Sequence, residues 1–339
     1  MGVDISALVH GAPLRLADLN GKAVAIDAFN TLYQFLTTIR QPDGTPLKDR
    51  NGRVTSHLSG MFHRSGALLE LGVRPAFVFD GKPPKLKERT LEIRRKARET
   101  AEREWKAAVE AGDLKKALTK ASQSTRLDDD MISETKSLLD SMGIPWLVAP
   151  SEGEAQIGLM AMKGDVWAGA SQDFDSLLFG TPTLVRNLTL SRKRKTGSGR
   201  TVDVEPELVE LRRVLDGLQL TRQQLVDMSI LIGTDFNKGV HGIGPKRALK
   251  IIRELGSLEE VAVAKRADVP EDFSEVRKVF LEPDVTEQYS LKWSEADDEG
   301  VRRILCDRHG FSVDRVDSVL SRVHRTTSSK SQSCLDSWG

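Results

Sequence analysis

The sequence predicts an α/β fold with a central, mostly parallel sheet flanked by helices. Two observations support this prediction. Short apolar runs, each of a length that suits a buried strand, recur along the first half of the chain. Amphipathic helical patterns separate these runs, and strands that alternate with helices are typical of a parallel sheet covered by helices. The 339 residues are enough to bury a large core.

In the first half of the chain, apolar runs predict strands and periodic segments predict helices. The predicted strands are residues 22–26, 75–79, 144–148 and 166–170. The predicted helices are residues 29–39, 58–71, 132–142 and 154–162. Residues 82–124, between two strands, are rich in Lys, Arg, Glu and Ala and predict a charged helical insertion. Such a segment is usually a solvated helix, but an insertion at this place also suits a mobile lid.

The second half of the chain is predicted to be mainly helical. It begins with a predicted pair of strands, 184–190 and 201–204, joined by the basic turn SRKRKTGSGR. Helical patterns fill residues 205–255, and residues 268–284 are loop-rich. A last pair of helices is expected near residues 297–309 and 313–324, followed by a polar, low-complexity tail at 326–333.

The composition excludes several classes of protein. Lys and Arg number 50 and Asp and Glu number 49, so any nucleic-acid-binding surface must be local. Two cysteines are too few for a disulfide framework and indicate a reduced, intracellular setting. The chain has no visible signal peptide or membrane-spanning run, so we expect no membrane association. The six histidines have no evident nucleophile partner, and we assign none of them to catalysis.

Acidic residues follow the predicted strands at the points where these strands end. The acids are Asp27, Asp80, Glu152, Glu154, Asp173 and Asp175. Because the carboxyl ends of parallel strands share one edge of a sheet, we expect these acids to converge there. A seventh, Asp235, follows a helical pattern at 225–232. An aspartate in such a place can also be an ordinary turn or helix cap, and Ser151 with Glu154 fits the S-x-x-E capping box.

A cluster of carboxylates of this kind requires cations. Two unit charges ~4 Å apart repel each other by ~4 kcal/mol at an effective dielectric constant of ~20. Oxygen ligands suit Mg²⁺ or Mn²⁺ and not Zn²⁺. Several carboxylates can hold two such ions ~3.5–4 Å apart, the arrangement used for phosphodiester hydrolysis. The acids therefore predict a two-metal hydrolytic site.

The segment GVHGIGPKRALKII resembles a helix-hairpin-helix motif. Its two turn glycines are followed by Pro245, which suits the first turn of a helix. Backbone amides at such a helix start bind a phosphate without reading the base. A plain helix–turn–helix is the alternative interpretation. The residues that we assign to DNA binding here are Gly242, Gly244, Lys246 and Arg247.

The charged insertion contains a row of cations. They are Lys82, Lys85, Lys87, Arg94, Arg95 and Arg98. Lys87 and Arg94 are seven residues apart, which places them two turns apart on one helix face. Cations that face a scissile phosphate stabilise developing negative charge, whereas those of a solvated helix have no such role. Tyr33, on the helix after Asp27, could stack on a base, although an isolated tyrosine more often packs in a core.

Five stretches resemble, in order and spacing, the motifs of the flap endonucleases, the 5′ structure-specific nucleases of replication and repair. They are VAIDAFNTLYQFL, FVFDGKPPKLK, MGIPWLVAPSEGEAQ, ASQDFDSLLFG and LIGTDFNKGVHGIGPKRAL. The resemblance implies that the seven acids are metal ligands and that Lys87 and Arg94 are the catalytic basic pair of a helical arch. It also implies a stacking role for Tyr33 and a small mature amino terminus at Gly2. Gly153 stands where the family usually has alanine.

The resemblance also implies a reaction. Mg²⁺, with two ions per site and Mn²⁺ as a substitute, would support hydrolysis at the junction of a 5′ flap and duplex DNA. A 5′–3′ exonuclease activity on nicked duplex DNA would accompany it, in Okazaki-fragment processing and DNA repair. The implied protein is a monomer. It works in the cytoplasm, at the nucleoid of an archaeal cell, or in the nucleus of a eukaryotic one.

By this resemblance the chain divides into regions. Residues 1–98 and 116–258 form one nuclease domain, 99–115 are arch helices, 259–325 are a C-terminal helical region and 326–339 are a flexible tail. Within the tail, residues 331–339 resemble a box that binds a sliding clamp of the proliferating-cell-nuclear-antigen type. Its contacts would be Gln332, Leu335 and Trp338, while Gly339 replaces the last aromatic residue and should weaken docking. A chance match in a disordered tail is the alternative.

Two other functions are compatible with the same fold. The first is a non-catalytic, clamp-tethered scaffold that binds DNA junctions. The seven acids argue against it, because bare carboxylates repel DNA phosphates. The second is an excision-repair or bubble-cutting relative within the nuclease superfamily. The short gap between Asp80 and Glu152 argues against the long spacer of the excision-repair branch.

Overall fold

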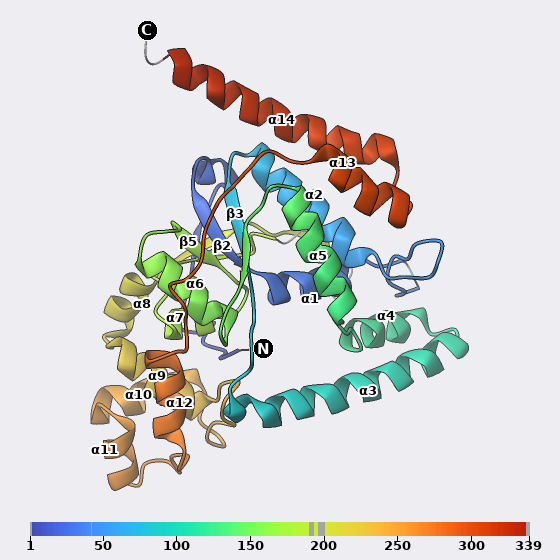
Figure 1. Cartoon of the computed structure of the whole chain (residues 1–339). Coiled ribbons are helices and arrows are strands. Elements are labelled where there is room, and N and C mark those ends of the chain that lie inside the picture. The colour runs from blue at the N-terminus through green and yellow to red at the C-terminus, as the bar shows by residue number, and fades with distance from the viewer. Residues whose placement is uncertain (1, 42, 190–192, 196–200, 337–339) are drawn as a thin grey trace.

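The computed structural model describes residues 2–41, 43–189, 193–195 and 201–336 (Figure 1). Its centre is a seven-stranded sheet in the order β1-β9-β6-β5-β2-β3-β4. Neighbouring strands from β6 to β4 are parallel, whereas β9 is antiparallel to both of its neighbours. The predicted α/β fold with a mostly parallel sheet is confirmed. The strands are β1 Ala12–Pro13, β2 Ala23–Asp27, β3 Arg74–Phe79, β4 Trp146–Val148, β5 Ala168–Ala170, β6 Thr183–Arg186 and β9 Glu207–Glu210.

Residues of β2 alternate between the two faces of the sheet. Val24 and Ile26 belong to the large apolar cluster that includes side chains of α1, α2 and α5. Ala23 and Ala25 belong to a smaller cluster with α6. Both faces of the strand are buried, as the continuous apolar run predicts. The helices are α1 Ala28–Thr38, α2 Ser56–Glu70, α5 Asp129–Ser141, α6 Gly153–Met162 and α7 Asp175–Leu178.

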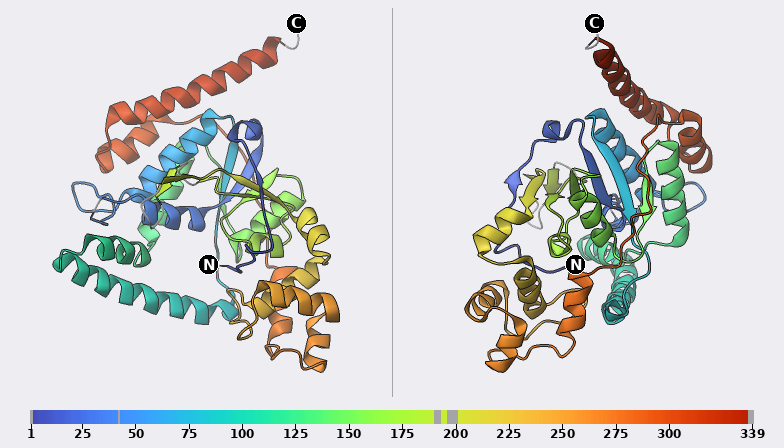
Figure 2. Two further views of the ribbon diagram at one scale, coloured as in Figure 1. Left: turned by 180° about the vertical axis from the view of Figure 1, so that it is seen from behind. Right: turned by 60° about the vertical axis from the view of Figure 1, so that its left-hand side comes forward.

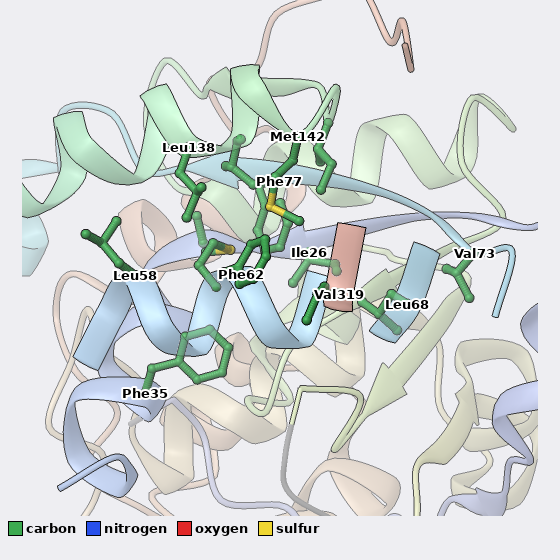
Figure 3. Close-up of a cluster of buried hydrophobic side chains, with 14 of the residues drawn as sticks. Ile26, Phe35, Leu58, Phe62, Leu68, Val73, Phe77, Leu138, Met142 and Val319 are labelled. Carbon is green, nitrogen blue, oxygen red and sulfur yellow. The ribbon is translucent and has the colours of Figure 1, made fainter. Parts of the chain in front are cut away.

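The large cluster is built from strands in the centre of the sheet and from helices far apart in the sequence. Figure 3 shows Phe77 of β3 among Phe62 of α2 and Leu138 and Met142 near the end of α5. Phe62 and Phe77 are 0% and 1% exposed, so this packing fixes the strands whose ends carry the acids. By contrast, β4 is the edge strand and Val148 is 45% exposed, so the prediction of a fully buried strand there was wrong.

After the last strand of the sheet the chain forms a group of helices, and their apolar side chains make up most of a second cluster that also includes Leu184 of β6 and Val209 of β9. The helices are α8 Leu211–Leu218, α9 Arg222–Ile232, α10 Pro245–Leu255, α11 Leu258–Val263 and α12 Phe273–Leu281. Arg277 of α12 links three of them, because its guanidinium pairs with Asp227 of α9 and Glu259 of α11, each at 2.7 Å. Two predictions for this part of the chain were wrong. Residues 207–210 were expected to be helical but form strand β9, because β6 and β1 supply strand partners. Residues 268–284 were expected to be loop-rich but contain helix α12.

The charged insertion forms α3 Glu88–Glu110 and α4 Leu114–Gln123. Figures 1 and 2 show α3 leading away from the rest of the chain and α4 returning beside it. Small side chains make this pairing possible, because Ala101 and Ala108 of α3 and Ala117 and Ala121 of α4 are all buried. Because alanine side chains are small, the apolar pattern of the sequence does not predict this contact between α3 and α4.

The strand pairing predicted for residues 184–190 and 201–204 was wrong. β6 pairs with β5 and β9, and a separate hairpin pairs β7 Lys193–Lys195 with β8 Thr201–Asp203. Residues 196–200, which belong to the predicted basic turn, lie outside the described residues. No helix in the described ranges is long and apolar enough to cross a membrane.

The C-terminal region consists of α13 Asp298–Arg302, a π-helical turn at Arg303–Arg308 and α14 Val313–Asp336. Side chains of α14, such as Val319, pack in the large cluster beside α2. The helix continues through most of the segment predicted as a flexible tail (Figure 2). His309, at the end of the π-helical turn, lies 3.1 Å from Asp49 and 3.0 Å from Glu134, and so connects this region to the loop before α2 and to α5.

Candidate active site

The predicted acids lie where the parallel strands end. Asp27 is the last residue of β2, and its carboxylate accepts a 2.9 Å hydrogen bond from the amide of Asn30 in α1. Asp80 follows β3 and accepts a 2.7 Å bond from the amide of Gly153, the first residue of α6. The Asn30 side-chain amide also donates to Asp173 at 3.3 Å. Asp27 is therefore a helix cap as well as a member of the group of acids.

Two further acids are held from elsewhere in the chain. Asp175 begins α7, and its carboxylate accepts a 2.7 Å hydrogen bond from the amide of Val3. The amino-terminal segment thus reaches the end of the sheet. Glu154 Oε1 accepts bonds from the hydroxyls of Ser171 and Ser176 at 2.7 and 2.9 Å. Each carboxylate has a fixed orientation, because a neighbouring segment donates to it.

Burial and repulsion by neighbouring charges raise the pKa values of Asp27, Asp80, Glu152, Glu154 and Asp175. Asp27 is 8% exposed, and its burial and the charge of Asp80 raise its pKa well above the usual value. Burial raises the pKa of Asp175 to about 7, and the charge of Asp235 adds to the effect. Burial and the charge of Asp175 raise the pKa of Glu154. Each of the seven predicted acids is close enough to at least one other for their charges to repel: Asp27, Asp80, Glu152, Glu154, Asp173, Asp175 and Asp235.

The capping box that is the alternative interpretation of Ser151 and Glu154 is absent. The residue at the N-cap of α6 is Glu152, one position after Ser151, and its side chain makes no capping bond. Glu154 points to Ser171 and Ser176 instead of the Ser151 amide. A Cβ atom at Gly153 would lie 2.8 Å from Asp80 Oδ1, so the missing side chain allows the close approach of Asp80.

Cations of the insertion lie directly against the acids. Lys87 Nζ is 2.5 Å from Glu152 Oε2 and 3.8 Å from Asp235 Oδ2, and the Arg94 guanidinium is 2.5 Å from Asp235 Oδ1. Although burial opposes it, the Glu152 carboxylate raises the pKa of Lys87. Lys87 ends a 3₁₀ turn, Lys85–Lys87, and is the N-cap of α3, the helix that carries Arg94. Both side chains reach Asp235, as expected for cations that share one side of the helix.

Tyr33 lies near the same group of charges. It is half-buried on α1, and the guanidinium of Arg98 is 5.1 Å from the centre of its ring. This distance is typical of a cation–π contact. The contact places the middle of α3 beside α1, and the ring is not fully packed in the core.

The donor set fits a hard divalent cation in its chemistry. All seven acids offer oxygen ligands, and the two cations that lie among them balance only part of the negative charge. Within the described ranges, however, no three His, Cys, Asp or Glu side chains have the arrangement of a metal-ligand set. Lys87 and Arg94 lie among the carboxylates instead, as counter-ions of Glu152 and Asp235.

The glycine-rich turn lies between α9 and α10. Gly242 has a φ of 73°, which an L side chain rarely adopts, and Gly244 is the N-cap of α10 with Pro245 in the first turn. Lys246 and Arg247 follow on the exposed side of the helix. The turn therefore presents backbone amides and two cations to solvent, as expected for a phosphate-binding helix start.

Sequence reasoning missed the residues that orient the acids. Asn30, Ser171 and Ser176 each bond an acid through a side chain, and Val3 does so through its amide. Asparagine and serine after strands are common turn residues, so nothing in their spacing indicates this role. The positions of the acids could be predicted because the acids follow predicted strands. The residues that donate hydrogen bonds to them could not, because those contacts depend on how distant segments pack together.

Comparisons with known proteins agree with this geometry. Residues 4–101 match the family model of the XPG N-terminal domain, and residues 143–235 match that of the XPG I-region. Flap endonuclease 1 of Pyrococcus abyssi is 51% identical over 341 residues, covering 100% of this chain and 98% of that protein. The flap endonuclease 1 of Methanosarcina acetivorans is 46% identical, with 100% of each chain covered.

Solved structures show the same similarity. Flap endonuclease-1 from Methanococcus jannaschii has a TM-score of 0.77 and 42% identity, and the match covers 97% of this chain and 100% of that one. The catalytic core of Rad2 in complex with DNA substrate has a TM-score of 0.70 and 25% identity, covering 92% and 96%. On these grounds the chain belongs to the flap endonuclease family.

Proposed function

We propose that this protein is a Mg²⁺-dependent flap endonuclease that cuts DNA where a 5′ single-stranded flap meets the duplex. One observation carries the proposal: seven carboxylates from separate segments repel one another at the ends of the parallel strands, and two cations of the α3 insertion lie among them. A junction-binding scaffold has no use for such a group, because carboxylates repel phosphates. The proposed role includes Okazaki-fragment processing, repair and an associated 5′–3′ exonuclease activity.

The residues of the chain have distinct parts in the proposed reaction. Two divalent ions, when bound, would activate a water molecule and stabilise the leaving oxygen. The seven acids would hold them, while Asn30, Val3 and the two serines keep acids oriented. Lys87 and Arg94 would then move from the carboxylates to the scissile phosphate, where cations stabilise charge that develops in the transition state.

The direct test is cleavage of a labelled 5′-flap substrate with and without Mg²⁺. We expect a product cut at the junction, with a 5′-phosphate and a 3′-hydroxyl end, only when Mg²⁺ or Mn²⁺ is present. Nicked duplex tests the exonuclease activity, and single-stranded DNA of the same sequence is the specificity control. Binding of the flap without any metal-dependent product would favour the non-catalytic scaffold.

Lys246→Ala should weaken duplex binding by a similar factor for every DNA sequence. The exposed Lys246 lies beside the turn at Gly244 and would neutralise a phosphate, which carries no base information. The slope of log affinity against log salt should fall in magnitude by about 1. Fluorescence anisotropy across a salt series measures both quantities. Lys250→Ala, one turn further along α10, is the matched control, and an unchanged slope for Lys246→Ala would remove this residue from the DNA interface.

The carboxyl terminus is proposed to bind a sliding clamp. Gln332 and Leu335 lie on α14, and Trp338 lies outside the described residues. Trp338→Ala should leave basal flap cleavage unchanged and abolish stimulation by a clamp of the same source, whereas Ser333→Ala, at a spacer position of the box, should retain it. Clamp stimulation that survives Trp338→Ala would rule out this contact. A protein of this function works at chromosomal DNA, which in an archaeal cell is the cytoplasmic nucleoid.

A further inference from the structure

Two buried serines hold the same oxygen of one acid. The hydroxyl of Ser171 lies 2.7 Å, and that of Ser176 2.9 Å, from Glu154 Oε1. Ser171 follows β5 and is 5% exposed, and Ser176 is in α7 and is fully buried. Hydrogen bonds from two separate elements therefore converge on a single carboxylate oxygen.

The direction of these bonds follows from the number of protons. Each hydroxyl has one proton to donate, and an ionised carboxylate can only accept. The Ser171 oxygen also accepts a bond from the Asp173 amide at 3.2 Å, so its single proton is left for Glu154. A carboxylate oxygen has about two lone-pair sites, and the two hydroxyls occupy both of them on Oε1.

We propose that Ser171 and Ser176 are positioning residues that make Glu154 a ligand through one oxygen, with Oε1 held by the hydroxyls and Oε2 left for a divalent cation. The inference rests on the proposed function, because it takes Glu154 as a metal ligand. Mg²⁺ demands a nearly ideal octahedral set of ligands, so a carboxylate that is prevented from rotating or chelating favours ordered binding. Partners that fix a ligand in this way commonly contribute to metal affinity.

The test measures ion binding to the DNA-free protein and does not depend on turnover. Mn²⁺ is titrated into the full chain, and free Mn²⁺ is counted by electron paramagnetic resonance. The double variant Ser171→Ala/Ser176→Ala should weaken binding of at least one ion by about 10- to 100-fold. Each single variant should show a smaller loss in the same direction, which keeps the test valid should the double variant fail to fold. Ser171→Thr, which retains the hydroxyl, should bind as the wild type does.

Ser65→Ala is the matched control, because Ser65 is a fully buried serine of α2 whose hydroxyl donates to the sulfur of Met61 and not to any of the seven acids in the part of the chain that the structure describes. Its Mn²⁺ affinity should be unchanged. Single serine variants that melt normally and bind Mn²⁺ like this control would overturn the inference. Glu154→Gln separates this failure from failure of the proposed function: a loss of affinity in Glu154→Gln alone sinks only the serine roles, whereas a wild type that binds no Mn²⁺ sinks the metal site itself.

Discussion

Asp175→Ala is expected to abolish flap cleavage while leaving flap binding intact or tighter. Asp175 is 4% exposed, and its burial among other acids raises its pKa to about 7, so its charge is costly in the folded state and a bound cation would offset that cost. Its loss should lower the single-turnover rate by about three orders of magnitude or more, equivalent to about 4 kcal/mol of transition-state stabilisation. Binding should not fall, because one charge that repels the DNA phosphates is removed.

Two measurements on the same preparation check this prediction. Quenched-flow cleavage at saturating enzyme gives the rate, and anisotropy in metal-free buffer gives the dissociation constant. Asp175→Asn adds an isosteric variant whose side-chain oxygen can still accept the Val3 amide, and it should lose the rate equally. Asp216→Ala, on the exposed side of α8, is the control. Parallel loss of rate and of binding in both Asp175 variants would mean that Asp175 supports folding or DNA contact and not ion binding.

The removal of a repelling charge also predicts a change in stability. A buried carboxylate whose neighbours share its sign costs free energy in the folded state. Asp175→Asn should therefore raise the melting temperature of the metal-free protein. This gain, coupled to loss of cleavage, is the trade-off expected at a site that is strained for function.

The position of the acids could be predicted from the sequence because simple rules determine it. Val24 and Ile26 mark a strand that must be buried, Asp27 comes where that strand ends, and parallel strands end at one edge. The same rule places Asp80. Each step depends on neighbouring residues in the chain, so no tertiary information is needed.

Other features required the folded chain. Strand β9 forms because Leu208 and Val209 complete a ladder with β6, whose partner cannot be inferred from a local pattern. The α3–α4 contact depends on alanines such as Ala101 and Ala117, whose burial follows from close approach and not from hydrophobicity. The bond from Val3 to Asp175 spans 172 positions. Long-range contacts of this kind depend on tertiary packing, and the periodicity of apolar residues in the sequence gives no information about it.

The positions of Lys87 and Arg94 depend on both a local pattern and a tertiary contact. A helical spacing of seven predicts that Lys87 and Arg94 share a face, and Lys87, at the N-cap of α3, does contact the same carboxylate as Arg94. Their common target, Asp235, is what brings them together. Lys87 and Arg94 thus act as internal counter-ions for acids that would otherwise repel one another. Divalent ions that bind these acids would compete with both side chains.

Lys87→Ala is expected to slow the chemical step much more than it weakens binding. Lys87 Nζ lies 2.5 Å from Glu152 Oε2, so it is beside one of the acids that would hold the ions. Loss of a cation that stabilises transition-state charge costs about 10²- to 10³-fold in rate. Single-turnover cleavage measures this loss, and Lys96→Ala, on the exposed face of α3, is the control. An unchanged rate would exclude Lys87 from the reaction. Because the alanine also removes a competing cation, Mn²⁺ should bind the DNA-free variant more tightly than the wild type. Loss of a residue that only supports the fold would not combine a slower single-turnover rate with a higher Mn²⁺ affinity.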